Sequence, residues 1–470
     1  MGGSDADAAT VGKPLHELSV REATQAMAAS AFTAESYVEA LLDWQRHWQM
    51  LNAYTQQQED AVRTAARAAA AIRSPIAGLP IAVKDNIDVA GYATTAGTPA
   101  LRRHIARSSA PVVRSLIDQG VVVMGKTGLH EMAAGGTCGN ITFGQVRNPY
   151  DPAMVPGGSS GGSAAAVGGQ DGPCGARDRH PPARSARRRP TAAASVSSRP
   201  RGATVASALS LATSGATTLG WCWFARSCDD VALLDACCAP AALTAPISLA
   251  GLRLGVPRAY FYETLEPAVA PVIEAMLARL SDAGVDLIEV DLPGVGDLLA
   301  QLGPMGRDLA AGLNVYIAES GAQVTAEDIV HGIADPQLRR GMEAALAAQA
   351  GVPPSTSAPA AVEALKAAYA GYFAAHRVAA MIFPTSPEVA YPAPADLAAG
   401  GTGPVAMIRN TLPGAHAGLP GLSIPAGLTA AGLPVGIELD GPLGSDRALL
   451  GIGAAIEAIT PPLPPPPLPT

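Results

Sequence analysis

The sequence predicts an α/β protein in which helices pack against a large, mostly parallel β-sheet. The chain has 470 residues, of which 48% are hydrophobic and 15% are charged, so it can bury a sizeable core. Short apolar runs at residues 81–83 and 121–124 are typical of buried strands. Residues 110–118 precede the second run and place their apolar side chains on one helical face. This alternation of helix and strand favours a parallel sheet.

The first elements of the chain are predicted to be helices. Residues 1–14 are small and polar, and we expect them to be disordered. Ser19 and Glu22 have the spacing of a capping box, which predicts the start of a helix. A second helix is predicted from Thr33, with an acidic residue in its first turn, and residues 58–73 form a third that is rich in Ala and Arg.

The C-terminal half continues the alternation of helices and strands. Residues 295–380 are predicted to be helical, to cover the functional site and to set its choice of ligand. Residues 430–432 are predicted to join two strands as a hairpin. The other predicted elements are, in order, a strand at 252–257, a helix at 267–284, strands at 285–290, 381–384, 419–428 and 433–439, a helix at 445–459, and a proline-rich tail at 461–470.

The composition limits the class of partner. The net charge is −8 and the isoelectric point is near 5.5, so nothing suggests binding to nucleic acid or to an acidic membrane. The six cysteines show no C-x-x-C pair and no metal-ligand spacing, which predicts free thiols in a reducing cytosol. Residues 1–12 lack the features of a signal peptide, and no apolar run of about 18 residues occurs. We therefore expect a cytoplasmic protein.

One stretch of small residues has the composition of a ligand-binding loop. Residues 157–163 contain only glycine and serine, so their backbone can approach a ligand closely. Three alanines at 164–166 predict a helix whose free N–H groups favour developing negative charge. Hydroxyl groups beside such a helix start suit acyl transfer. From this stretch alone, a flexible turn with Ser163 as the N-cap is an equal alternative.

A lysine ends the first predicted strand. Residues 81–83 are apolar, and Lys84 follows them at the edge of the predicted core. A lysine that loses contact with water loses its charge easily and can act as a base near neutral pH. The alternative for a lone lysine at a strand end is that its amine simply extends into solvent.

Lys84 and the glycine–serine loop, in this order and about 75 residues apart, resemble the amidase signature family. Residues 148–152, 381–387 and 418–428 are also similar to segments of that family. The resemblance implies one α/β/α domain, residues 15–460, around a large mixed, mostly parallel twisted sheet flanked by helices. It also implies hydrolysis of a carboxamide to an acid and ammonia through an acyl-enzyme, without a cofactor or metal ion.

The resemblance assigns roles to individual residues. In this family a lysine deprotonates a serine held by a cis-peptide, and that serine activates a second, nucleophilic serine. The first two roles carry over to Lys84 and Ser159. The supporting positions of the loop are Ser160, Gly157, Gly158 and Gly161. A second glycine-rich loop supplies the residues that we expect to line the substrate, which are Thr137, Cys138 and Gly139.

The third member of the relay does not carry over. In the family it is the serine of a block that reads roughly Gly-Thr-Asp-x-Gly-Gly-Ser, and the matching position, 24 residues after Ser159, is Ala183. Pro181 and Pro182 precede it and have no N–H to donate to an oxyanion. Loss of one oxyanion donor typically costs about 10²–10³ in rate, and loss of the nucleophile costs more. Ser185 lies two residues further on, beyond the reach that a relay needs.

Residues 169–225 differ in composition from the rest of the chain. Arginines and prolines crowd this stretch, and no strand periodicity is apparent. One interpretation is a basic arm for nucleic acid, which would normally carry interleaved aromatic residues. A second is a diverged, catalytically inactive amidase fold. A third is an amidase gene that is read out of frame between two compensating frameshifts, because GC-rich codons read off-frame give Arg, Pro, Ala and Ser.

A different motif match is weaker than its spacing suggests. Gly120, Gly125, Lys126 and Thr127 fit the phosphate-loop pattern G-x-x-x-x-G-K-[ST]. Three valines and a methionine fill the interval and predict a strand instead of a flexible loop. Nucleotide binding is therefore not expected, and the resemblance leaves Lys126 outside the catalytic set.

Within the family, the overall similarity is nearest to amidases of small arylalkyl amides, of the mandelamide or indoleacetamide type. We expect a small-molecule amide as the ligand and no nucleic-acid or membrane partner, and the sequence leaves a homodimer open. A transamidosome subunit of the same family would need partner chains. The alternative from a different class is an inactive amidase-fold protein that binds a ligand without hydrolysing it.

Overall fold

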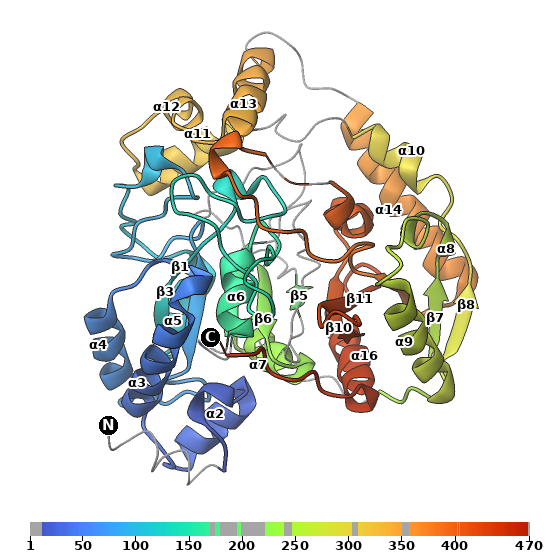
Figure 1. The fold of residues 1–470 in the computed structure, drawn as a ribbon, viewed down its shortest axis with the longest axis horizontal. Helices are drawn as coiled ribbons and strands as arrows, with labels where there is room; N and C mark the ends of the chain where they lie inside the picture. The colour runs from blue at the N-terminus through green and yellow to red at the C-terminus, as the bar shows by residue number, and fades with distance from the viewer. Residues whose placement is uncertain are drawn as a thin grey trace.

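The computed structural model describes residues 12–169, 174–178, 195–198, 221–238, 247–302, 309–349, 357–401, 403 and 405–468. Within this part of the chain, eleven strands form one sheet, and helices lie on both of its faces (Figure 1). Strands from the N-terminal half of the chain make one half of the sheet, and strands from the C-terminal half make the other. The predicted single α/β/α fold is confirmed.

The strands follow one another across the sheet in an order that differs from their order in the sequence. From one edge to the other they are β1 (Tyr54–Gln56), β3 (Val122–Thr127), β2 (Pro80–Lys84), β4 (Cys174–Asp178), β6 (Trp221–Ala225), β5 (Ser195–Ser198), β10 (Gly421–Leu428), β11 (Pro434–Asp440), β9 (Ala380–Pro384), β7 (Arg253–Val256) and β8 (Asp286–Glu289).

The α-helices include those that the sequence predicted from Ser19, from Thr33, at 58–73 and at 110–118, and the third of these ends earlier than predicted, at Ala69. Capping boxes at Ser19 and Thr33 start the first two of these. In chain order the described helices are α2 (Val20–Ala28), α3 (Ala34–Gln45), α4 (Glu59–Ala69), α5 (Pro111–Asp118), α6 (Gly161–Gly168), α7 (Cys228–Cys238), α8 (Arg258–Phe261), α9 (Ala270–Asp282), α10 (Val295–Ala300), α11 (Leu309–Ser320), α12 (Ala326–His331), α13 (Pro336–Gln349), α14 (Ser357–His376), α15 (Leu412–His416) and α16 (Asp446–Ile459).

The sheet contains less parallel pairing than the alternation of helix and strand predicted. β2 pairs in parallel with β3 and β4, and β7 pairs in parallel with β8 and β9. The other pairings of the described strands are antiparallel, including the predicted β10–β11 hairpin. The mixed sheet is confirmed, and its mostly parallel character is corrected. The physical reason is that antiparallel neighbours in the middle of the sheet need no crossover helix between them.

Three strands lie in the stretch where the sequence showed no strand periodicity. β4, β5 and β6 all fall within residues 169–225 and fill the middle of the sheet between β2 and β10. A strand that is covered on both faces needs no alternation of apolar and polar residues, so its periodicity is weak. The rest of this stretch, residues 170–173, 179–194 and 199–220, lies outside the described residues.

The pleat of β2 divides its side chains between two layers. Ile81 and Val83 belong to the main hydrophobic core, which they form with helices α2, α3, α4, α5, α7, α9 and α16. Ala82 packs on the other face, in a smaller cluster with alanines of α6. Because consecutive residues of a strand point to opposite faces, Lys84 at the end of β2 lies on the side of α6.

Helices α11, α12 and α13 form a satellite cluster against loops at one edge of the molecule (Figure 1). Their apolar side chains pack on Ala96, Leu101 and Met132. The carboxylate of Glu131 accepts hydrogen bonds from the backbone N–H groups of Ala334 and Asp335, each at 2.9 Å. The satellite cluster is thus attached to loops that follow the strand ends and has its own small apolar core.

Both ends of the described chain contact the body of the protein. Lys13 lies within the segment expected to be disordered, and it forms an ion pair of 2.6 Å with Glu22. The hydroxyl of Tyr150 donates to the carbonyl of Pro464, and Pro466 is buried, so the proline-rich tail lies against the surface. Residues 1–11 and 469–470 are outside the described residues.

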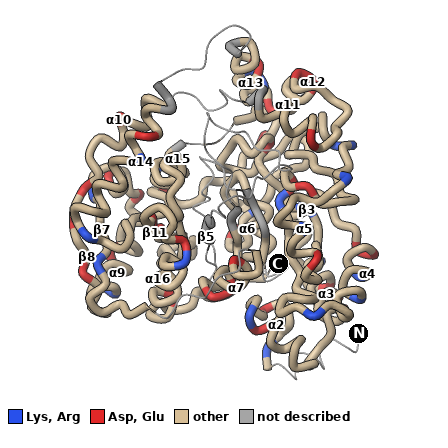
Figure 2. Tube along the Cα trace, turned by 180° about the vertical axis from the view of Figure 1, so that it is seen from behind, with Lys and Arg blue, Asp and Glu red and all other residues tan. Residues whose placement is uncertain are grey.

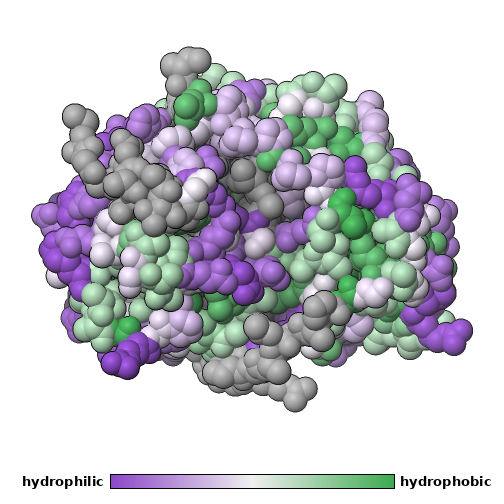
Figure 3. All heavy atoms as spheres, turned by 90° about the horizontal axis from the view of Figure 1, so that it is seen from below, coloured by the Kyte–Doolittle hydropathy of each residue, from purple (hydrophilic) through white to green (hydrophobic). Residues whose placement is uncertain are grey.

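Charged residues of both signs are mixed on the described surface. In Figure 2, Lys and Arg lie among Asp and Glu along the outer helices. The lower face in Figure 3 likewise shows hydrophilic and hydrophobic residues intermixed. Across the described ranges, no helix has the length and apolar composition that crossing a membrane requires. Five of the six cysteines, Cys138, Cys174, Cys228, Cys237 and Cys238, are free thiols, as predicted.

A buried carboxylate joins α7 and α16 in the core. Oε2 of Glu457 accepts a hydrogen bond of 2.8 Å from the backbone N–H of Cys228. Burial raises the pKa of Glu457 to about 7, the hydrogen bond from Cys228 opposes the rise, and the negative charges of Asp230 and Asp229 add to it. Ionised Glu457 is therefore disfavoured in the folded protein.

We expect Glu457→Gln to change how the stability of the protein depends on pH. A carboxyl whose pKa is about 4.5 in the unfolded chain and about 7 in the folded protein removes stability as the pH rises between these values. Glutamine does not ionise. The free energy of unfolding of the variant, relative to that of the wild type, should therefore be roughly 2–3 kcal/mol higher at about pH 8 than at pH 4.5. Urea unfolding at both pH values measures this gain. Exposed Glu327→Gln is the matched control, and a Glu457→Gln effect independent of pH would contradict the prediction.

Candidate active site

Strand β2 carries Lys84 into the interior of the protein. All five residues of the strand are buried, and the side chain of Lys84 has no exposed surface. Its Nζ donates a hydrogen bond of 2.9 Å to Oγ of Ser159, which is also fully buried. The two residues that the sequence singled out are therefore in contact, although 75 positions separate them in the chain.

The glycine–serine loop turns into α6 at Gly161. Gly157 has a φ of +91°, a backbone conformation that favours glycine. The peptide bond between Gly158 and Ser159 is cis. Ser160 occupies the N-cap position of α6, but its side chain makes no capping hydrogen bond. The loop thus presents the Ser159 hydroxyl at the start of a helix, where the sequence placed it.

Ser163 has a different role from the N-cap that was the alternative prediction. It lies inside α6, and its Oγ is 2.6 Å from Oγ1 of Thr127. Thr127 is the last residue of β3 and is the register partner of Lys84 in the parallel pairing of β2 with β3. A second hydroxyl contact therefore ties α6 to the strand ends, one helical turn beyond Ser159.

Close packing of two loops explains the glycines around Ser159. A Cβ atom on Gly158 would lie 2.6 Å from the carbonyl oxygen of Gly135 and 2.8 Å from the carbonyl carbon of Gly136. A Cβ atom on Gly161 would lie 2.7 Å from Sγ of Cys138. All three distances are too short for a real side chain, so these positions require glycine.

The backbone of Ser159 is held by the second loop. Its carbonyl oxygen accepts a hydrogen bond of 3.0 Å from the N–H of His130 and one of 3.1 Å from the thiol of Cys138. The same sulfur accepts a hydrogen bond of 3.0 Å from the N–H of Gly161. The structure thus places the Cys138 thiol, a predicted substrate contact, against the serine loop and in the buried interior.

Thr137 and Gly139, the other predicted substrate contacts, flank Cys138. Oγ1 of Thr137 accepts a hydrogen bond of 3.3 Å from the N–H of Gly139 and lies 3.4 Å from Nδ1 of His130. Burial lowers the pKa of His130 to about 4, against an opposing effect of the Asp335 charge, so the imidazole is neutral at pH 7. Sequence reasoning missed His130, because no spacing pattern marks it.

Sequence reasoning also missed a buried ion pair beside Lys84. The phosphate-loop pattern forms strand β3, as its valines predicted. Lys126 in this strand has no exposed surface, and its Nζ lies 3.0 Å from Oδ1 of Asp85. A signal for this pair was present, because a carboxylate directly follows Lys84 and a second lysine lies near the end of the neighbouring strand.

The position expected for the nucleophile cannot be compared with this geometry. Ala183 lies outside the described residues, as do Pro181 and Pro182. The described site therefore consists of Lys84, Ser159 and the two loops that hold them.

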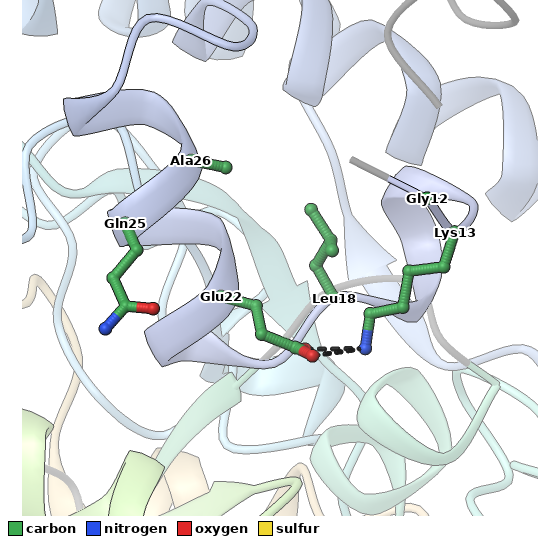
Figure 4. A pocket seen from close by; sticks show the side chains of 6 residues that line it. All are labelled: Gly12, Lys13, Leu18, Glu22, Gln25 and Ala26. Atoms are coloured by element: carbon green, nitrogen blue, oxygen red, sulfur yellow. Dashed lines mark hydrogen bonds and ion pairs between the residues drawn. The ribbon is translucent and has the colours of Figure 1, made fainter. Parts of the chain in front are cut away.

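Two surface pockets lie away from this site, beside the N-terminal helices. One has a volume of about 410 Å³, and the ion pair between Lys13 and Glu22 crosses it (Figure 4). The other has a volume of about 670 Å³ and lies between α2, α3 and the residues that follow α4. Neither pocket is lined by Lys84 or Ser159.

The described chain is thus an α/β/α protein in which a buried lysine meets the serine of a glycine-rich loop. The chain belongs to the amidase family, since the family described as Amidase matches its residues 36–176 and 221–450. The match omits residues 177–220.

Individual relatives agree with this assignment. The chain is 34% identical over 403 residues to an indoleacetamide hydrolase of Agrobacterium vitis, a match that covers 81% of this chain and 83% of the relative. It is 32% identical over 481 residues to a mandelamide hydrolase of Pseudomonas putida, which covers 95% and 92% of the two chains. A solved crystal structure of an amidase superposes with a TM-score of 0.78 at 27% identity and covers 94% of this chain and 100% of that one. The predicted family is confirmed.

We expect Gly158→Ala to destabilise the protein and to move Ser159 away from Lys84. The added Cβ would lie 2.6 Å from a backbone oxygen, so the loops must separate. Overpacking of this kind typically costs about 1–3 kcal/mol, which urea unfolding measures. Gly341→Ala in α13 is the matched control, because a Cβ there meets nothing within 4 Å, and it should leave the protein equally or more stable. Equal stability of the two variants would count against the packing argument.

Proposed function

We propose that this site is built to hydrolyse a small carboxamide through a serine–lysine proton relay. The observation that carries the proposal is the buried contact of 2.9 Å between Nζ of Lys84 and Oγ of Ser159. Burial disfavours the charged form of an amine, and a neutral amine can accept the serine proton. The Ser159 oxygen would then take the proton of an attacking hydroxyl, and the same path in reverse would deliver it to the leaving amine.

The loop packing suits this role for Ser159. Its carbonyl is held by His130 and Cys138, so the side chain has a fixed position relative to Lys84. A proton relay requires separations of about 3 Å between its members, and small displacements reduce its rate strongly. The hydrogen bonds to the Ser159 backbone therefore support a preorganised relay.

The arylalkyl substrate class is part of the same proposal. It is supported by the similarity to enzymes named for indoleacetamide and mandelamide, each of which joins an aromatic group to a primary amide. The helices between residues 295 and 376 are the part of the chain that we propose to set this choice.

A specific observation favours a second candidate, an inactive amidase-fold protein that binds amides. The position that should carry the attacking hydroxyl is Ala183, and Pro181 and Pro182 offer no N–H to an oxyanion. Without a nucleophile and with fewer oxyanion donors, turnover would fall by several orders of magnitude. Binding of the substrate does not require the attacking oxygen.

We expect Lys84→Ala to abolish any release of ammonia from phenylacetamide. The physical reason is that Ser159 then has no base, and loss of one member of such a relay typically removes at least about 10³ in rate. A coupled ammonia assay measures the rate, and Lys366→Ala, which removes an exposed lysine paired with Glu363, is the matched control. Clear turnover by Lys84→Ala would defeat the relay. Calorimetric binding of phenylacetamide without turnover by the wild type would identify the inactive candidate.

We further propose that residues 169–225 include a segment translated out of frame. The interruption of the family match at residues 177–220 supports this proposal. So does the genetic code. Residues 177–180, Arg-Asp-Arg-His, can be encoded by CGG GAC CGA CAC, and the next codon begins with C. Read one base later, these bases are GGG ACC GAC ACC, which encode Gly-Thr-Asp-Thr. These are the first four residues of the family's nucleophile block, at the positions where that block is expected. The codons of Pro181 and Pro182, read in the same shifted frame, begin with C and cannot encode the Gly-Gly that follows, so the proposal requires a further insertion or deletion next to position 181.

We expect resequencing of the gene to reveal compensating insertions or deletions on either side of this segment. The corrected chain should carry the complete Gly-Thr-Asp-x-Gly-Gly-Ser block, with serine at position 183. In the ammonia assay it should exceed the chain with Ala183 by at least about 10³ in rate. A clean, uninterrupted frame that encodes residues 169–225 as they stand would remove the proposal and leave the inactive candidate.

A further inference from the structure

The lysine of the unused phosphate-loop pattern is buried at the same strand ends as the candidate base. Lys126 and Asp85 both have no exposed side-chain surface, and the atoms of their ion pair are 3.0 Å apart. Nζ of Lys126 also donates hydrogen bonds to the carbonyl of Ala93 at 2.9 Å and to Oγ1 of Thr94 at 3.3 Å. A buried pair with this many partners is costly to break, because either charge alone would be left without compensation.

The carboxylate of Asp85 has its own set of donors. The hydroxyl of Thr95 donates to Oδ2 at 2.5 Å, and the hydroxyl of Thr55 donates to the same atom at 2.9 Å. The backbone N–H of Thr95 lies 3.3 Å from Oδ1. Asp85 thus joins β1, the end of β2, β3 and the loop that follows β2, and this arrangement fixes the backbone next to Lys84.

The sheet pleat sends the two lysines to opposite faces. In the parallel register, Lys126 is opposite Val83 and Thr127 is opposite Lys84. Val83 belongs to the main core, whereas Lys84 reaches Ser159 on the α6 side. Since Asp85 follows Lys84 directly, its side chain turns back to the side of Val83, where Lys126 lies. Lys84 meets a hydroxyl on one face while Asp85 meets a cation on the other.

We propose that Asp85 and Lys126 are positioning residues that keep Lys84 available as a neutral base. Lys126 compensates the negative charge of the Asp85 carboxylate, which is adjacent to Lys84 in the chain. Because it is compensated, this charge does not stabilise the protonated form of the Lys84 amine. The proposal rests on the proposed role of Lys84. It gives Lys126, the lysine of the phosphate-loop pattern, an electrostatic role in place of phosphate binding.

Other titratable groups surround this pair. Asp88 and His104 lie within electrostatic range of Lys126, and the hydroxyl of Tyr316 donates to Oδ1 of Asp88 at 2.9 Å. Burial raises the pKa of Asp88 and lowers the pKa of His104, so burial shifts both toward their neutral forms. Asp85 is the carboxylate in direct contact with the Lys126 amine.

The experiment follows the protonation of Lys84 directly. The chain contains four lysines, Lys13, Lys84, Lys126 and Lys366, so the full-length protein labelled with ¹³C-lysine gives few Cε resonances. Single substitutions of Lys13, Lys84 and Lys366 by methionine assign them. The pH titration of the Lys84 resonance is then compared in the wild type, Lys126→Met, Asp85→Asn and the double variant.

The proposal predicts shifts of opposite sign. Lys126→Met leaves the Asp85 charge unpaired near Lys84, so the midpoint of the Lys84 titration should rise by about one pH unit. Asp85→Asn leaves the Lys126 charge unpaired, so the midpoint should fall by a similar amount. The double variant carries neither charge and should return to within a few tenths of a pH unit of the wild-type midpoint. Lys366→Met, which removes an exposed pair, should cause no shift.

The outcomes separate this proposal from the relay itself. Unchanged midpoints, or shifts of the same sign, in the variants that fold would overturn the electrostatic role of the pair. If one single variant fails to fold, the sign of the shift in the other still decides. If the signs are as expected but Lys84→Ala retains turnover, the pair acts on Lys84 and the relay is wrong.

Discussion

The close approach of two nearly side-chain-free loops is the constraint on which this site depends. Gly158 can lie against the backbone of Gly135 and Gly136 only because it has no Cβ. That approach brings the Ser159 carbonyl within reach of His130 and Cys138 and leaves its hydroxyl facing Lys84. The strand ends supply the other half of the geometry. Lys84 and Ser159 therefore come from elements that are distant in sequence and meet in the folded chain.

The sequence predicted the parts of the site that rest on local composition. The apolar run before Lys84 and the small residues around Ser159 were enough to place both, and the family resemblance paired them. The sequence showed a carboxylate next to Lys84 and a lysine near the end of a second strand, but the contact between Lys126 and Asp85 depends on strand register and on which face each residue occupies. The central strands were also missed, and in β6 the consecutive residues Trp223, Phe224 and Ala225 are all buried, so they carry no alternating pattern. The pairing of Ser163 with Thr127 likewise needs tertiary structure.

In this chain, the segments that form the described scaffold are separate from the block that should carry the nucleophile. The described sheet, its flanking helices and the lysine–serine contact lie before and after the positions that should carry the nucleophile, and those positions are outside the described residues. The family match reflects the same division, because it resumes at residue 221 after the interruption. Membership of the family thus rests on the segments on either side of the interruption. In the proposed relay the third member belongs to a short block within that interruption, so under this proposal a change confined to the block would alter activity while the family scaffold is retained.

The attachment of α11, α12 and α13 has an evolutionary consequence. These helices bury their apolar residues largely among themselves and on two loops, and the Glu131 carboxylate fastens them through backbone N–H groups. Hydrogen bonds from main-chain N–H groups do not depend on which side chains the helices carry. Their sequence can therefore diverge freely while the junction persists. Helices α11, α12 and α13 could therefore be replaced during evolution to accommodate other ligands, while the sheet keeps its structure.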